Sequence, residues 1–277
     1  RGVFQVDGWG ELDVALAYGA FTRQVPAAKG AGEARVFVLQ YHDWRSVLKT
    51  DNRTLAARRA DSSNIAITTF GGHYIHAFDA APGAFDMLFW GAAQFGSWGA
   101  LDHRAGALAV EGGFQPPLRI LRPWIRLGYL YGSGDANPND ATHSTFFQVL
   151  PTGRWYARFP FYNLMNSQDA FAHLTLRPHQ KLAIRSEARW LRLASRADLW
   201  YQGGGAFQPW TFGYVGRPSG GAASFCTLFD VSADYQVNAR LAATVYFGAA
   251  QGKSAIASTY PKGRNARLSY VEFTYRF

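Results

Sequence analysis

The stretch SYVEFTYRF, residues 269–277, decides the fold class of this chain. Every second residue from Ser269 is small, apolar or aromatic, and the residues between them are polar or amphipathic. A β-strand with one apolar face and one wet face has this period of two. The segment therefore predicts a strand with hydrocarbon on one side and water on the other, so that apolar residues mark the exterior and charged residues mark a lumen.

The same alternation recurs along most of the chain, and turn-rich segments separate the repeats. It predicts about eleven strands, at residues 10–22, 33–44, 63–78, 84–98, 101–114, 119–132, 169–177, 181–193, 224–236, 240–252 and 266–277. We therefore expect an all-β protein, an antiparallel transmembrane β-barrel. A last strand that ends on an aromatic residue such as Phe277 is typical of the barrels of the bacterial outer membrane.

The connections between these strands alternate in length. Counted back from Phe277, alternate connections of an outer-membrane barrel should be long outer loops and short inner turns. The long ones are 253–265, 194–223, 133–168 and 45–62, and the short ones are 237–239, 178–180, 115–118 and 79–83. The tight connection near 99–100 departs from this rule, because its position in the count places it on the outer side.

The number of strands bears on domain organisation. Single bacterial barrels have an even number of strands, and about eleven is odd. A barrel that lacks several strands would expose two unpaired edges, which lipid does not tolerate. We interpret residues 1–277 as one outer-membrane barrel domain that is incomplete at its N-terminal side and forms the C-terminal portion of a larger barrel.

Composition supports this interpretation and excludes others. Aromatic residues make up 16% of the chain, as the aromatic girdles of a membrane barrel require. No apolar run approaches the roughly 18 residues of a transmembrane helix. The net charge of +9 indicates an anionic partner, and the scattered Lys and Arg residues argue against nucleic acid. Cys226 is the one cysteine, so an internal disulfide is excluded.

Alternation also assigns faces to individual residues. The apolar set comprises Leu12, Val14, Leu16, Tyr18, Leu121, Ile125, Leu127, Tyr129, Leu182, Ile184, Ala188, Trp190, Phe225, Phe229, Val231 and Tyr235. The opposite, polar set comprises Glu11, Asp13, Arg122, Arg126, Arg185, Glu187, Arg189, Asp230, Ser232 and Asp234. An Arg or Lys at the lipid midplane costs about 2–4 kcal/mol, so the polar set implies a water-filled interior.

Two interpretations of Arg122, Arg126, Arg185 and Arg189 stay open. They could form a structural ladder with acidic residues such as Glu187 and Asp230. They could also line a constriction, because rings of arginine select anions and the planar guanidinium matches a carboxylate. Both can hold at once.

The segment TGRWYARFPFYN, residues 152–163, carries a second candidate site. Arg154 and Arg158 lie four residues apart beside Trp155 and Tyr156. Aromatic rings stack on sugars and arginines pair with carboxylates, so this loop suits an acidic polysaccharide. The alternative is a loop that folds inward and is held by its own aromatic residues.

Metal and catalytic sites are not expected. Asp135, Asn137, Asn139 and Asp140 could offer oxygen ligands to calcium, but they lack the bidentate Glu of a full calcium loop, and Asx turns explain them more simply. His73 and His76 are three residues apart in a strand and point to opposite faces.

No catalytic grouping emerges from the remaining histidines. His103 lies near a strand, and His143 precedes Ser144 without an orienting third group at a recognisable spacing. We therefore expect no cofactor and no enzyme activity.

The loops identify a family by resemblance. The stretches RPWIRLGYLYGSGDANPND (122–140), TFFQVLPTGRWYARFPFYN (145–163), LWYQGGGAFQPWTFGY (199–214) and YVEFTYRF (270–277) resemble the alginate export family of outer-membrane porins. With the strands between them they cover roughly Arg119 to Phe277. The resemblance implies a large monomeric barrel of about eighteen strands with an Arg-lined pathway for a polyuronate.

The expected function follows from both arguments. We expect an integral protein of the bacterial outer membrane whose lumen passes an anionic polysaccharide such as alginate, with Arg122, Arg126, Arg154, Arg158, Arg185, Arg189, Trp155 and Tyr156 as substrate-binding residues. The alternatives are a general porin for small anions, and a surface-binding barrel whose lumen is plugged by its loops.

Overall fold

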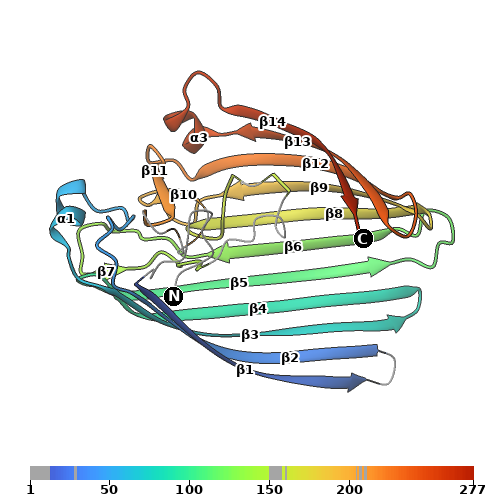
Figure 1. Ribbon diagram of the computed structural model, residues 1–277, viewed down its shortest axis with the longest axis horizontal. Coiled ribbons are helices and arrows are strands. Elements are labelled where there is room, and N and C mark those ends of the chain that lie inside the picture. Colours follow the sequence, from blue (N-terminus) through green and yellow to red (C-terminus); the bar gives the residue numbers. More distant parts are fainter. Residues whose placement is uncertain are drawn as a thin grey trace.

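The computed structural model describes residues 13–27, 30–149, 158–159, 161–203, 205, 208 and 211–277. Within these residues, twelve strands form one curved, antiparallel sheet, in which β7 adds a short parallel pair to β5 (Figure 1). The path of the sheet follows chain order: β1 (Val14–Ala27), β2 (Gly30–Asp43), β3 (Ile65–Ala80), β4 (Gly83–Trp98), β5 (Leu101–Gln115), β6 (Trp124–Gly132), β8 (Ser167–His179), β9 (Leu182–Arg192), β12 (Ser224–Gln236), β13 (Leu241–Gly252) and β14 (Asn265–Tyr275).

The prediction of an all-β antiparallel fold is confirmed, and each of the eleven predicted strands has a counterpart in this path. The largest boundary errors are at the first and sixth strands. β1 extends to residue 27 instead of 22, and β6 begins at Trp124 instead of residue 119. The sixth strand starts late because Pro116, Pro117 and Pro123 cannot donate ladder hydrogen bonds.

The two ends of the sheet differ as the connection lengths predicted. Long segments join β2 to β3, β6 to β8, β9 to β12 and β13 to β14 at one end, which we call the loop end. Short turns join β3 to β4, β8 to β9 and β12 to β13 at the other, the turn end (Figure 1). The tight β4–β5 connection lies at the loop end, as expected. Among the described helices, none has the length and apolar character to cross a membrane.

The long segments contain structure that the alternation did not predict. The helices α1 (Leu55–Ala60) and α3 (Ser254–Thr259) lie in two of them. The segment between β9 and β12 forms the hairpin of β10 (Leu199–Gly203) and β11 (Tyr214–Pro218), and β7 (Thr142–His143) lies between β6 and β8. These elements are too short to show a period in the sequence.

The outer face of the sheet exposes apolar side chains. Phe229 is 48% exposed, Val245 is 55% exposed and Phe273 is 70% exposed, and register places them on the face opposite Arg185 and Arg189. A water-soluble sheet would bury such residues in a dry centre. The predicted alternation is therefore confirmed for the C-terminal strands.

The outer-face assignments of Val14, Leu16, Tyr18 and Phe225 are wrong. Val14, Leu16 and Tyr18 lie on the inner face, because register pairs them with Asp43, Tyr41 and Leu39. Near the loop end the inner face is itself apolar, since it packs against the loops, so apolar residues of β1 turn inward. Leu12 and Glu11 lie outside the described residues. Phe225 is buried, because a β-bulge between Ser224 and Cys226 interrupts the alternation there.

The loops fold over the inner face and form its apolar core. One cluster joins strand residues with loop residues: Tyr41, Ile65, Ile67, Trp98, Phe147, Met165, Tyr201, Phe212 and Tyr214. The side-chain amide of Gln94 holds the segment after β7, because it donates to the carbonyl of Phe147 at 2.8 Å and accepts from its N–H at 2.7 Å. The interior at the loop end is therefore filled by chain segments.

The sheet is open, with β1 and β14 as its edge strands. Each edge leaves backbone N–H and C=O groups without a partner strand among the described residues. Lipid cannot satisfy such groups. The larger, closed barrel stays a prediction.

Candidate functional site

The candidate site is a band of charged side chains across the inner face, which we call the inner ladder. The alternation of each strand brings these residues to one face, and register places them opposite one another. Its members are Asp86, Glu111, Arg126, Arg158, Asp169, His173, Arg185, Glu187, Arg189 and Asp234.

Arg189 is the most buried member of the inner ladder. Its side chain is 4% exposed and forms ion pairs with Asp169 and Glu187, while its guanidinium lies 4.7 Å from the ring centre of Phe171. Tyr162 from the preceding loop donates a hydrogen bond to Asp169 at 3.0 Å. Arg189 therefore joins β8, β9 and a loop, and its charge is matched by two acids.

Arg126 is held in a similar way between three strands. It forms an ion pair with Glu111 of β5, and its Nε lies 3.6 Å from a carboxylate oxygen of Asp86 in β4. Trp124 Nε1 donates to Asp86 at 2.7 Å, and its ring lies 4.9 Å from the Arg126 guanidinium. Asp86 and Glu111 were not predicted as partners, although their positions in β4 and β5 have the parity of the inner face.

Arg185 and Arg158 share a single acid. Arg185 lies 3.4 Å from one oxygen of Asp234, and Arg158 lies 3.5 Å from the other. Thr244 also donates to Asp234 at 2.7 Å. The Arg185 side chain is 43% exposed, unlike that of Arg189. This arrangement leaves an accessible excess of positive charge on the inner face.

The predicted loop site is partly described. Arg158 reaches the inner face of β12, and the neighbouring Phe159 and Phe161 pack against the cluster that contains Trp200 and Phe225. This part of the loop is folded inward. Arg154, Trp155 and Tyr156 lie outside the described residues.

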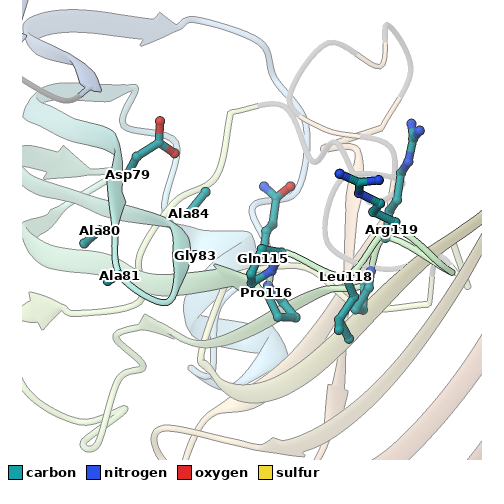
Figure 2. Close-up of a pocket in the computed structure, with 12 residues that line it drawn as sticks. Asp79, Ala80, Ala81, Gly83, Ala84, Gln115, Pro116, Leu118 and Arg119 are labelled. Carbon is teal, nitrogen blue, oxygen red and sulfur yellow. The ribbon is translucent and has the colours of Figure 1, made fainter.

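Arg122 lies apart from the other predicted arginines. It belongs to the connection between β5 and β6, where Leu121 and Arg122 both have positive φ, 66° and 40°. The prediction that Arg122 lies in a strand with Arg126 is therefore wrong, because the prolines delay the strand. Arg122 lines a pocket at the turn end together with Arg119, and Figure 2 shows the position of Arg119 in this pocket.

The histidines at positions 73, 76, 103 and 143 contact neighbouring side chains of the sheet and its loops. His103 and His143 approach within 2.9 Å in a buried stack against Trp98, and His73 contacts Glu33 at 2.9 Å. His76 contacts Tyr74 on the opposite face from His73, as strand geometry predicted. In the part of the chain that the structure describes, no group of three or more His, Cys, Asp or Glu residues is placed to hold a metal ion.

The polar loop 135–140 forms a series of Asx turns. The Asp135 carboxylate accepts from Asn137 N at 3.0 Å, the Asn137 side chain from Asn139 N at 3.2 Å, and the Asp140 carboxylate from Thr142 N at 2.9 Å. These hydrogen bonds are those of Asx turns, which is the simpler of the two interpretations given for this loop.

Asp198 anchors the loops to one another. It accepts hydrogen bonds from Thr145 Oγ1 at 2.6 Å, Tyr201 Oη at 2.7 Å, and the backbone N–H groups of Asp135 and Leu199 at 3.0 and 2.7 Å. Burial, opposed by these hydrogen bonds, raises the pKa of Asp198 to about 6. No periodic pattern in the sequence marks this residue.

Comparison with known proteins agrees with a sheet that has an apolar outer face and a charged inner face. A search of curated proteins gives no match. The family model described as "Alginate export" matches residues 20–255, which is most of the chain. The chain therefore belongs to the alginate export family, a family of outer-membrane transport channels.

Proposed function

We propose that this protein is an integral outer-membrane channel that passes an acidic polysaccharide of the alginate type. One observation carries the proposal: a single curved sheet exposes apolar residues on its outer face and carries paired charges on its inner face. Lipid favours the first face and water the second. Family membership supports transport of a polysaccharide. Because short turns face the periplasm in such barrels, the turn end is the periplasmic entrance.

Arg185 and Arg158 are proposed to contact the substrate, while Arg126 and Arg189 stabilise the sheet by joining its neighbouring strands. Arg185 and Arg158 share Asp234 and are partly exposed. A sugar carboxylate can therefore pair with one guanidinium while Asp234 keeps the other as its partner. Arg126 and Arg189 each have two acidic partners. Arg154, Trp155 and Tyr156 belong to the same loop as Arg158 and are proposed to extend this contact surface.

Replacement of Arg158 and Arg185 by Gln should weaken block of the channel by oligouronates. The loss of two accessible charges should raise the blocking constant about tenfold, equivalent to about 1.4 kcal/mol. The measurement is single-channel conductance in planar bilayers with oligomannuronate on either side. The matched control is Arg104→Gln, an exposed and paired arginine on the outer face. Equal block of the wild type, the double variant and the control would contradict the assignment.

A charge on the outer face should be costly. Val245→Arg places a cation halfway along β13 on the exposed apolar face, where insertion should lose about 2–4 kcal/mol. Thr244→Arg is the control, because Thr244 lies beside it on the inner face and faces Asp234. Refolding into lipid vesicles over a urea series measures both. Similar midpoints for the two variants would argue against a lipid-facing exterior.

A plugged, surface-binding barrel is a second candidate, favoured by the loops that fill the loop end of the interior. Liposome swelling separates the two. A channel should admit small sugars and swell, whereas a plugged barrel should not. A general porin for small anions would swell but would show no block by oligouronates.

A further inference from the structure

The connections at the turn end carry a set of exposed cations, which we call the turn-side rim. Its members are Arg119, Arg122, Arg177, Lys181, Arg240 and Arg276, and all six are exposed. Among the described residues, none of them forms an ion pair. The segments 116–123, 177–181 and 236–240 contain no Asp or Glu. Asp79 lies beside the neighbouring β3–β4 turn but, in the described part of the chain, is not within ion-pair distance of these cations, so positive charge exceeds negative charge in the rim, in contrast to the inner ladder.

Backbone hydrogen bonds join these connections into one row. Arg177 N donates to the carbonyl of Leu121 at 2.6 Å, which ties the β5–β6 connection to the end of β8. Gln236 N donates to the carbonyl of Lys181 at 2.8 Å, and Arg276 N to the carbonyl of Arg240 at 2.9 Å. The cations therefore follow one continuous edge of the sheet.

The row continues the inner face of the sheet. Lys181 precedes Ala183 and Arg185 with the same parity, and Arg276 follows Glu272 and Thr274, which pair with inner residues of β13. Arg240 has the parity of Thr244, which faces Asp234. The Lys181 ammonium also donates to the carbonyl of Val237 at 3.2 Å, which holds it near the neighbouring turn.

A pocket of about 860 Å³ lies at one end of the rim, between residues 79–84 and 115–123. Arg119 and Arg122 line it, and Pro116, Pro117 and Pro123 stiffen its wall. Figure 2 shows Asp79 on the opposite side of the pocket from Arg119, with Gln115 between them. The volume suits a small portion of a sugar chain, and two unpaired guanidinium groups suit its carboxylates.

We propose that the turn-side rim is the entry site that captures the carboxylates of the polysaccharide before it reaches the inner ladder. This inference rests on the proposed function. A row of unpaired cations raises the local concentration of a polyanion and speeds its association. In the inner ladder, where Arg126 and Arg189 are matched by acids, Arg158 and Arg185 then contact the chain as it passes.

The rim is distinguished from a headgroup site for anionic lipid by its side of the sheet. A lipid site would lie on the outer face, whereas the parity of Lys181, Arg240 and Arg276 is that of the inner face. Arg119 and Arg122 line a pocket that also contains Gln115, an inner-parity residue of β5.

The test is block of the full-length channel by oligouronate added separately to each side of a planar bilayer of zwitterionic lipid. Arg119→Gln/Arg122→Gln/Arg177→Gln should lower the association rate from the turn side about tenfold, while the dissociation rate and block from the loop side stay unchanged. The difference should shrink as salt rises, because screening weakens steering. The triple Lys variant keeps the charge and should restore the rate if the Gln variant is correctly folded. The matched control is Arg59→Gln/Arg196→Gln/Arg264→Gln at the loop end.

The outcomes are separable. Wild-type block from the turn side with an unchanged rate in the Gln variant would overturn the entry site and leave the proposed function standing. Absence of any block in the wild type would overturn the proposed function itself. An effect of the Gln variant that appears only when anionic phospholipid is added would assign the rim to lipid and overturn the entry site.

Discussion

Replacement of Arg189 by Ala should lower the free energy of unfolding by about 3–5 kcal/mol, because it leaves two acids in the wall without their partner. Asp169 is 2% exposed, so its carboxylate would have to remain charged in a dry site or take up a proton. Tyr162 would lose the fixed acceptor that holds its loop against β8. Unfolding in urea, followed by tryptophan fluorescence in vesicles, measures the loss.

Arg185→Ala is the matched control, because Arg185 lies four residues earlier on the same face of β9 and its side chain is far more exposed. Its loss should cost about 0–1 kcal/mol. Replacement of the whole cluster, Arg189→Met with Asp169→Asn and Glu187→Gln, should recover much of the stability, since no buried charge remains. Equal costs for the two single Ala variants would contradict the structural assignment of Arg189.

Replacement of Asp198 by Ala should loosen the loops that fill the loop end and enlarge the conductance. Thr145, Tyr201 and the N–H of Asp135 would each lose a buried acceptor, at about 1–3 kcal/mol apiece. Single-channel recording should show a larger and noisier current. Asp140→Ala is the control, because Asp140 is exposed and accepts only the local Asx-turn bond from Thr142 N among the described contacts. Indistinguishable currents in the two variants would contradict an anchoring role.

The raised pKa of Asp198 adds a pH dependence. Its pKa lies near 6 in the folded loops and near 3.8 in an unfolded chain, so folding takes up a proton between these values. This contribution to loop stability is complete below about pH 4 and is lost as pH rises through about 6. Asp198→Asn should remove that dependence, which limited proteolysis of the loops across pH 4–8 can measure.

Strand positions could be predicted from sequence because the solvent on each face imposes a period of two. The eleven predicted segments follow that period, and the same period correctly places Arg126, Arg185 and Arg189 on the inner face. The prediction was wrong where a second apolar environment exists. Val14 packs against a cluster that contains loop residues distant in the chain, Leu16 and Tyr18 share its parity, and no local pattern reports such a contact.

The partners of the charged residues were harder to predict than their faces. Asp86 and Asp169 have inner parity, but pairing depends on the register between strands, which turn length alone does not fix at a bulge or a proline-rich connection. Asp198 and Gln94 carry their roles through loop contacts across the sequence. Such contacts arise from tertiary packing and leave no periodic signal.

The amide of Gln94 binds both backbone groups of Phe147, as a neighbouring strand would. Phe146 N likewise donates to the carbonyl of Ser133 at 2.9 Å, and β7 pairs with β5. The backbone N–H protons of Phe146 and Phe147 should exchange with deuterium as slowly as those of the sheet, because this segment opens only when the sheet opens. The segment around Phe146 and Phe147 is consequently a fixed lining of the sheet and does not move as a gate. Any widening of the passage must come from other segments.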